Sequence, residues 1–198
     1  KHIVERYGLE TVSKWHLQCF NEADIPQFFL SEYPATEEDT LKYRLPAYCK
    51  MYEAFESGIR RVSDRLQIGG PALAAYQAFL GGFLDHVKEK NLKLDFISVH
   101  NYGTHPNLIN SGKRPVSVQN TVNVHSAAVK TVNDHGFGHL PLLVDEWGFC
   151  SAGYFNKDEC PALMMRETEQ FSAYFAKMIH QFIAEDFKVD MLCICLSG

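Results

Sequence analysis

The chain has 198 residues, a length that fits one domain with a buried core. Its apolar content is 46%, its charged content is 22% and its net charge is −5, without blocks of like charge. These values argue against nucleic acid or an anionic membrane surface as a partner, and no apolar run approaches the ~20 residues of a membrane-spanning helix.

Helical and strand patterns alternate along the chain. In chain order we expect a helix over 1–12, a strand near 15–20, a helix over 37–64, a strand at 66–68, a helix over 73–90, a strand over 94–100, a helix over 117–134, a strand over 140–145, a helix over 166–185 and a strand over 189–196. Pro46 should kink or split its helix. Gly69-Gly70-Pro71-Ala72 is expected to close the second strand tightly.

This alternation predicts an α/β fold with a parallel sheet. Five strands with four intervening helices make about five-eighths of a (β/α)8 TIM barrel. Residues 1–198 would then form one partial catalytic barrel. Barrel enzymes place their functional groups in the loops that follow the strands, so the strand ends are the first place to look for chemistry.

Two glutamates end short apolar runs. Glu22 follows the strand near 15–20, and Glu146 follows the strand over 140–145. Paired carboxylates perform glycoside hydrolysis, with retention at a separation of about 5–5.5 Å and inversion at about 6.5–9.5 Å. Asn21 offers an amide suited to a sugar hydroxyl. Alternatively, a glutamate in this position is only a neighbour of a helix N-cap or a surface charge.

Other polar and aromatic side chains follow strand ends. His100 and Tyr102 would point into the same barrel mouth, where the tyrosine hydroxyl could hydrogen-bond an ionised carboxylate. Trp147, Tyr102, Phe28 and Phe29 could form apolar platforms for sugar faces.

Metal and thiol chemistry are weaker alternatives. His100 and His105 could bind a metal with a carboxylate, but a flexible loop separates them, and we expect no metal and no cofactor. The six cysteines match no common zinc pattern, and Cys19 lacks the companions of a thiol nucleophile. We expect free thiols, and hence a reducing, cytoplasmic location, although Cys150 and Cys160 flank a loop and could pair in a secreted protein.

Several segments, in order, resemble glycoside hydrolase family 39, which contains β-xylosidases and α-L-iduronidases. Trp15 to Asp24 is similar to the Trp-x-Phe-Glu-Val-Trp-Asn-Glu-Pro-Asp segment of the family. The other similar segments are Val4–Glu10, Ile68–Ala72, Leu94–His100 and Leu142–Trp147.

The resemblance implies strands 4 to 8 of a (β/α)8 barrel that hydrolyses β-xylosides or related glycosides with retention. Glu22 would be the general acid/base at the end of strand 4, and Glu146 the nucleophile at the end of strand 7. Asn21, His100 and Tyr102 would contact the sugar or support a carboxylate. The implied partner is a carbohydrate, no cofactor is implied, and the oligomeric state is open.

The chain also departs from the family pattern. Ala23 stands where proline is usual, Asp145 stands where threonine is common, and the last strand lacks a sugar-stacking tryptophan. These departures keep open a non-catalytic, carbohydrate-binding relative of the same fold. Strand alternation should point Asp145 and Glu146 to opposite sides of the sheet.

The sequence opens at Lys1 without a methionine, which suggests a piece of a longer polypeptide. Strands 1 to 3 of the implied barrel are not represented. We therefore expect this chain, assayed alone, to hydrolyse glycosides poorly or not at all.

Overall fold

The computed structural model describes residues 1–75, 77–103, 117–148, 168–184 and 191–192. Five strands of this part form one sheet in the order β1-β2-β3-β4-β5, and every neighbouring pair is parallel. The strands are β1 (His16–Gln18), β2 (Gln67–Leu73), β3 (Phe96–Asn101), β4 (Leu142–Trp147) and β5 (Met191–Leu192). All strands therefore end at the same edge of the sheet, as predicted.

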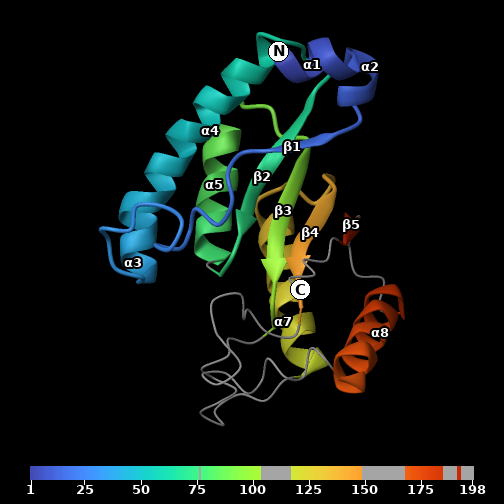
Figure 1. Ribbon diagram of the computed structural model, residues 1–198. Coiled ribbons are helices and arrows are strands. Elements are labelled where there is room, and N and C mark those ends of the chain that lie inside the picture. The colour runs from blue at the N-terminus through green and yellow to red at the C-terminus, as the bar shows by residue number, and fades with distance from the viewer. Residues whose placement is uncertain (76, 104–116, 149–167, 185–190, 193–198) are drawn as a thin grey trace.

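Helices connect the strands and cover the sheet (Figure 1). They are α1 (His2–Tyr7), α2 (Leu9–Val12), α3 (Glu37–Asp39), the π-helical turn η1 (Thr40–Arg44), α4 (Leu45–Arg60), α5 (Gln77–Lys90), α7 (Val118–Asp134) and α8 (Glu169–Ala184). Helix α5 packs on β2 and α7 packs on β3. None of the helices in the described part is both long and apolar enough to cross a bilayer.

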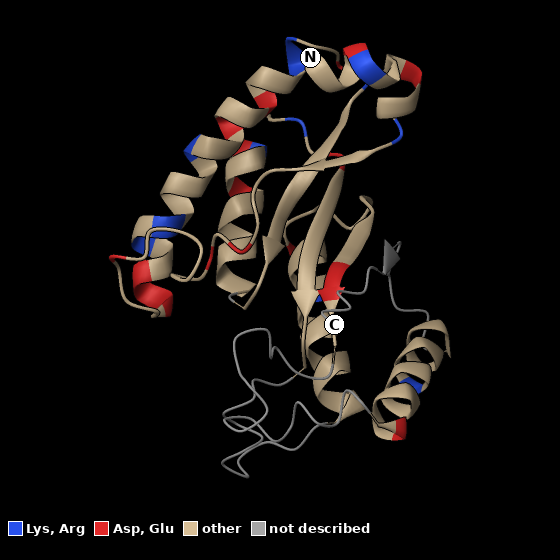
Figure 2. Cartoon of the chain, in the orientation of Figure 1, with Lys and Arg blue, Asp and Glu red and all other residues tan. Residues whose placement is uncertain are grey.

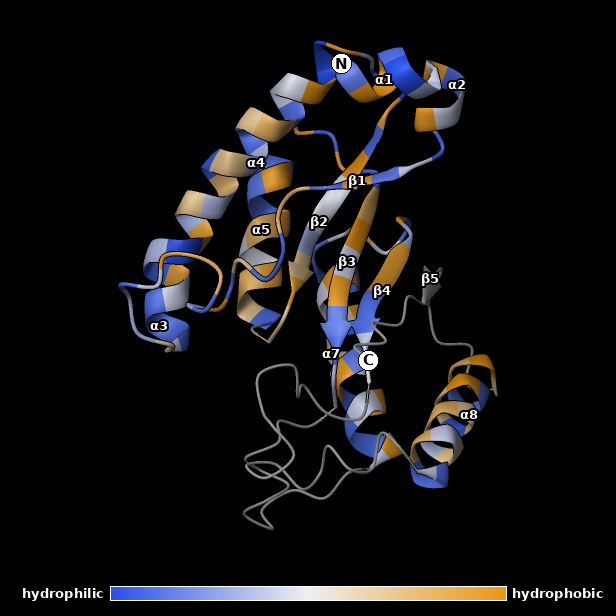
Figure 3. Cartoon of the chain, viewed as in Figure 1, coloured by the Kyte–Doolittle hydropathy of each residue, from blue (hydrophilic) through white to orange (hydrophobic). Residues whose placement is uncertain are grey.

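The core lies around β2 and β3, in which every residue except Gln67 is buried. Burial along the whole strand is typical of a parallel sheet. Figure 3 shows β3 and β4 as mainly apolar until their ends, where polar residues begin. Four aromatic rings of α4 and α5 pack against one another beside the sheet, and the centroids of contacting rings are 4.9–6.4 Å apart. These rings belong to Tyr48, Tyr52, Phe79 and Phe83.

Strand β2 is longer than predicted. The glycines were expected to end it after residue 68, but pairing with β3 continues it to Leu73, and the next helix begins at Gln77 rather than at 73. A Cβ at Gly69 would lie 2.3 Å from the carbonyl oxygen of Phe96. Glycine is needed here because the two backbones approach too closely for any side chain.

The predicted helix over 37–64 is split, as Pro46 suggested. Pro46 is the second residue of α4, and the π-helical turn η1 lies directly before it. Proline lacks an amide hydrogen, and its ring collides with the carbonyl four residues earlier in a regular helix. A wider turn relieves that collision. The helix ends at Arg60, four residues before the predicted end.

Arg44, at the end of η1, is fully buried and holds the loop that follows Glu22. Its guanidinium donates hydrogen bonds to the carbonyl oxygens of Phe29 (3.0 Å), Leu30 (3.3 Å), Tyr33 and Pro34 (3.0 Å), and to the Thr40 hydroxyl (3.1 Å). Removing this side chain would leave several buried carbonyl groups without a donor, which destabilises a fold.

We expect Arg44→Met to lower the free energy of unfolding by about 3 kcal/mol or more, since a hydrogen bond to a charged group contributes about 1.5–3 kcal/mol. Urea unfolding followed by tryptophan fluorescence measures this loss. Arg61→Met, at an exposed arginine, is the matched control and should change stability by less than about 0.5 kcal/mol. Equal stability of the two variants would contradict the anchoring role of Arg44.

Candidate active site

Contacts with the end of β2 fix the backbone of Glu22, which lies in the loop after β1. Glu22 has a left-handed backbone (φ 49°), and its amide donates to the carbonyl oxygen of Ala72 at 3.1 Å. The buried carboxylate of Asp24 accepts hydrogen bonds from the amides of Ala74 (3.0 Å) and Ala75 (2.8 Å). A left-handed non-glycine residue persists only where its surroundings hold it, and such residues cluster at functional sites.

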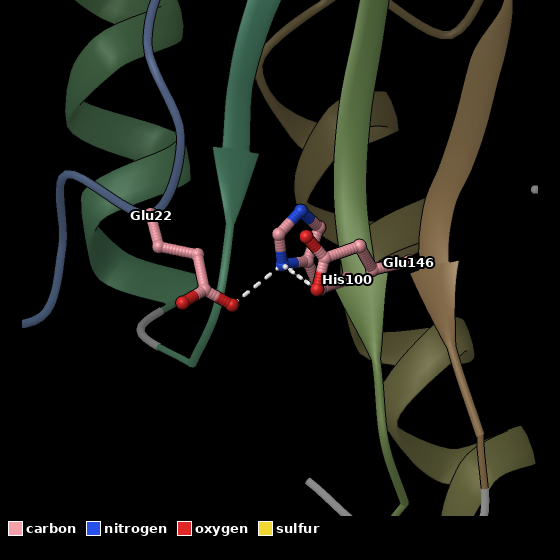
Figure 4. Close-up of side chains that lie close together, drawn as sticks. All are labelled: Glu22, His100 and Glu146. Carbon is pink, nitrogen blue, oxygen red and sulfur yellow. Dashed lines mark hydrogen bonds and ion pairs between the residues drawn. The ribbon is translucent and has the colours of Figure 1, made fainter. Parts of the chain in front are cut away.

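His100, near the end of β3, lies between the two predicted catalytic residues (Figure 4). Its side chain is fully buried. The Nδ1 atom is 2.6 Å from Glu22 Oε1 and 3.6 Å from Glu146 Oε2. Folding therefore brings the two glutamates to the same imidazole, although 78 positions separate Glu22 from His100 along the chain.

The two carboxylates approach each other closely. One carboxylate oxygen of Glu22 lies within 4.8 Å of one carboxylate oxygen of Glu146. The Tyr102 hydroxyl donates a hydrogen bond to Glu146 Oε2 at 2.9 Å, the kind of contact expected from the sequence. The acidic end of β4 is visible in Figure 2 as the red tip of a strand that is otherwise uncharged.

The direction of the Asp145 side chain contradicts one prediction. Strand alternation was expected to point Asp145 and Glu146 to opposite sides, but Asp145 Oδ1 lies 3.6 Å from His100 Nε2, and Glu146 reaches Nδ1 of the same ring. The register with β3 explains this: Val144 pairs with Val99, whereas Glu146 pairs with His100. Asp145 is thus an extra residue in β4, and such a bulge redirects side chains.

The remaining predicted site residues lie at different depths. Asn21 is exposed beside Glu22. Trp147 is 3% exposed, and its ring packs on Phe175 of α8 with centroids 4.7 Å apart. Sugar contacts by Asn21 and Trp147 stay predictions.

The residues of the metal and thiol alternatives are only partly described. His105 lies outside the described residues, as do Cys150, Cys160, Cys193 and Cys195. Cys19 and Cys49 are free and buried.

The electrostatics of the site centre on His100. Burial acts to lower the pKa of His100, but the hydrogen bond to Glu22 and the charges of three carboxylates raise it above its ordinary value. Because the folded-state pKa is raised, protonation of His100 stabilises the fold at low pH, and this contribution is lost as the pH rises through that pKa.

Burial also raises the pKa of Asp145, helped by the Glu146 charge and opposed by the His100 charge and a hydrogen bond from Gln18. Sequence reasoning missed two supporting residues, Asp24 and Gln18. For Asp24 a signal existed, because the residue closes the segment that resembles Asn-Glu-Pro-Asp.

Glu22, His100 and Glu146 also form a donor set that could hold a metal ion. One imidazole nitrogen and two carboxylate oxygens are ligands that Zn²⁺ accepts. The 2.6 Å separation between His100 and Glu22 is that of a hydrogen bond, which a metal ion would have to replace.

Parallel strands covered by helices, with two close carboxylates at the strand ends, are typical of the glycoside hydrolases built on (β/α)8 barrels. The family model of the glycosyl hydrolases family 39 matches residues 1–188. The chain therefore belongs to this family, which confirms the resemblance found in the sequence.

Relatives with similar sequences include a β-xylosidase and an α-L-iduronidase. A β-xylosidase of Geobacillus stearothermophilus is 24% identical over 187 residues, which are 91% of this chain and 33% of that protein. An α-L-iduronidase of Canis lupus familiaris is 29% identical over 115 residues, which are 52% of this chain and 16% of that protein. The chain thus spans a third or less of the length of these relatives.

Solved structures confirm the fold. The monomeric β-xylosidase from Caulobacter crescentus CB15 superposes with a TM-score of 0.73 at 22% identity, over 98% of this chain and 36% of that one. The family 39 enzyme from Xanthomonas axonopodis pv. citri superposes with a TM-score of 0.72 at 23% identity, over 98% and 35% of the two chains. The predicted partial (β/α)8 barrel is therefore correct.

Proposed function

We propose that this chain carries the catalytic pair of a retaining glycoside hydrolase that acts on β-xylosides or related glycosides, with Glu146 as nucleophile and Glu22 as acid/base. The close approach of the two carboxylates carries this proposal. One oxygen of Glu22 lies within 4.8 Å of one oxygen of Glu146, which is shorter than the separation of about 6.5–9.5 Å that leaves room for a water in inverting enzymes.

The reaction has two steps. The Glu146 carboxylate attacks the anomeric carbon while Glu22 gives its proton to the leaving oxygen, so one glycosidic bond breaks and one ester bond forms. Ionised Glu22 then takes a proton from water, the resulting nucleophile attacks the same carbon, and Glu146 leaves as a carboxylate. Two displacements on one carbon retain its configuration.

The hydrogen bonds of the two glutamates support this division of roles. Glu146 accepts a hydrogen bond from the Tyr102 hydroxyl, which orients one oxygen of the proposed nucleophile. Glu22 shares a hydrogen bond with His100, a titratable group that can hold or release a proton. The acid/base must change its protonation state in each step, so a titratable neighbour suits it.

Substrate recognition is assigned to the same strand ends. Asn21, His100, Tyr102 and Trp147 are the proposed sugar-contacting residues, and the names of the Geobacillus and Caulobacter relatives favour a β-xyloside. Because the chain spans about a third of the Geobacillus relative, we place activity in a longer polypeptide that supplies the other strands. A cytoplasmic location stays a prediction from the cysteine content.

Product stereochemistry tests the proposal. The full-length polypeptide that carries these residues should hydrolyse 4-nitrophenyl β-xyloside, and ¹H NMR should show β-xylose as the first product, before mutarotation. α-Xylose as the first product would contradict retention. Sugar binding in a calorimeter without any hydrolysis would instead favour the non-catalytic, carbohydrate-binding alternative.

A further inference from the structure

The far side of the His100 ring faces a second acid. Nε2 of His100 lies 3.6 Å from Oδ1 of Asp145, and neither atom has a hydrogen-bond partner within the described residues. Both atoms are buried. The imidazole thus has Glu22 at one nitrogen and Asp145 at the other, and the bulge in β4 places Asp145 there.

We propose that Asp145 is a positioning residue that acts through His100 on Glu22. The inference rests on the proposed acid/base role of Glu22. In a neutral imidazole one nitrogen carries the proton and the other accepts. An ionised carboxylate facing Nε2 keeps the proton on that nitrogen and aims Nδ1 at Glu22.

With Nε2 protonated, one exchangeable proton lies between Nδ1 and Glu22. It resides on Glu22 when His100 is neutral, or on Nδ1 when His100 is an imidazolium ion. The pair loses this proton to the leaving oxygen in the first step and regains one from water in the second. The opposite tautomer, with the proton on Nδ1, would donate to Glu22 permanently and oppose its protonation.

The charged groups around the ring agree with this arrangement. Glu22 faces His100 from the loop after β1, and Asp145 and Glu146 face it from β4. Gln18 of β1 hydrogen-bonds to Asp145, and Tyr102 hydrogen-bonds to Glu146. Burial lowers the pKa of His100, while the Glu22 hydrogen bond and these charges raise it, with Asp145 the largest of the charges.

Asp145→Asn in the full-length polypeptide tests the inference, because it removes the charge and keeps the shape. NMR of ¹⁵N-labelled histidine should show His100 titrating at lower pH than in the wild type, and the neutral wild-type ring should carry its proton on Nε2. The kcat should fall by about 10- to 100-fold, by analogy with the loss seen when a metal-binding histidine is deprived of its orienting partner. The KM should change little, and the pH profile of kcat/KM should move to lower pH.

Two further variants separate this role from general damage. Asp85→Asn is the matched control, because Asp85 pairs with His135 at 2.6 Å away from the site, and the His100 titration should stay as in the wild type. Asp145→Glu keeps the charge and should restore the His100 titration at least in part.

An unchanged His100 titration in Asp145→Asn, or a neutral ring protonated on Nδ1, would overturn the inference. The NMR result does not depend on hydrolysis, so it stands apart from a failure of the proposed function.

Discussion

Replacing Glu146 with alanine is expected to lower kcat for an aryl β-xyloside by about a million-fold in the full-length polypeptide, the scale on which loss of a covalent nucleophile acts in a hydrolase. The physical reason is that alanine offers no carboxylate with which to form the glycosyl ester. Steady-state hydrolysis of 4-nitrophenyl β-xyloside measures the loss.

Azide should restore part of this activity, because the small anion fits the space that the Glu146 side chain leaves. The product would then be a glycosyl azide of inverted configuration. Glu89→Ala, at an exposed glutamate of α5, is the matched control and should hydrolyse at the wild-type rate. Wild-type activity in Glu146→Ala would remove Glu146 from the mechanism.

The second large effect concerns Glu22. Glu22→Gln keeps the size of the side chain and a polar contact with His100, but it cannot deliver a proton to the leaving oxygen. For xylobiose, whose leaving group needs that proton, we expect kcat/KM to fall by about 100- to 10,000-fold, the usual contribution of general acid catalysis. For an activated aryl glycoside the loss in kcat/KM should be much smaller.

The contrast between the two substrates is the diagnostic result. Glu53→Gln is a suitable control, since Glu53 also pairs with a histidine, His86, at 2.8 Å but lies outside the site. An equal loss with both substrates would mean that Glu22 shapes the site rather than protonating the leaving group.

The order of helices and strands could be predicted from the sequence, because each buried strand is a short apolar run between helical stretches. The residues at which the strands end were harder to predict from the sequence. The pattern of Gly69 and Gly70 predicts a turn, but pairing with β3 supplies the partners that keep these residues in a strand. Local propensity yields here to contacts with a distant segment.

In the site, too, some features could be predicted from the sequence and others depend on contacts between distant segments. Glu22, His100 and Tyr102 follow apolar runs and could be assigned to one edge from the sequence. The direction of Asp145 could not be predicted, since it depends on the bulge in the β3–β4 register. The burial of Trp147 could not be predicted either, because its contact with Phe175 depends on how α8 packs.

Glu22 follows β1 in the chain, but its backbone is anchored to the end of β2. Its amide bonds to Ala72, and Asp24 bonds to the amides of Ala74 and Ala75. The distance between the two glutamates therefore depends on the ladder from β2 to β4 as well as on the edge strand β1. Additional strands that completed the barrel beyond β1 would meet two glutamates that are already in place. Such strands would add contacts to the sugar and leave the distance between the two carboxylates unchanged.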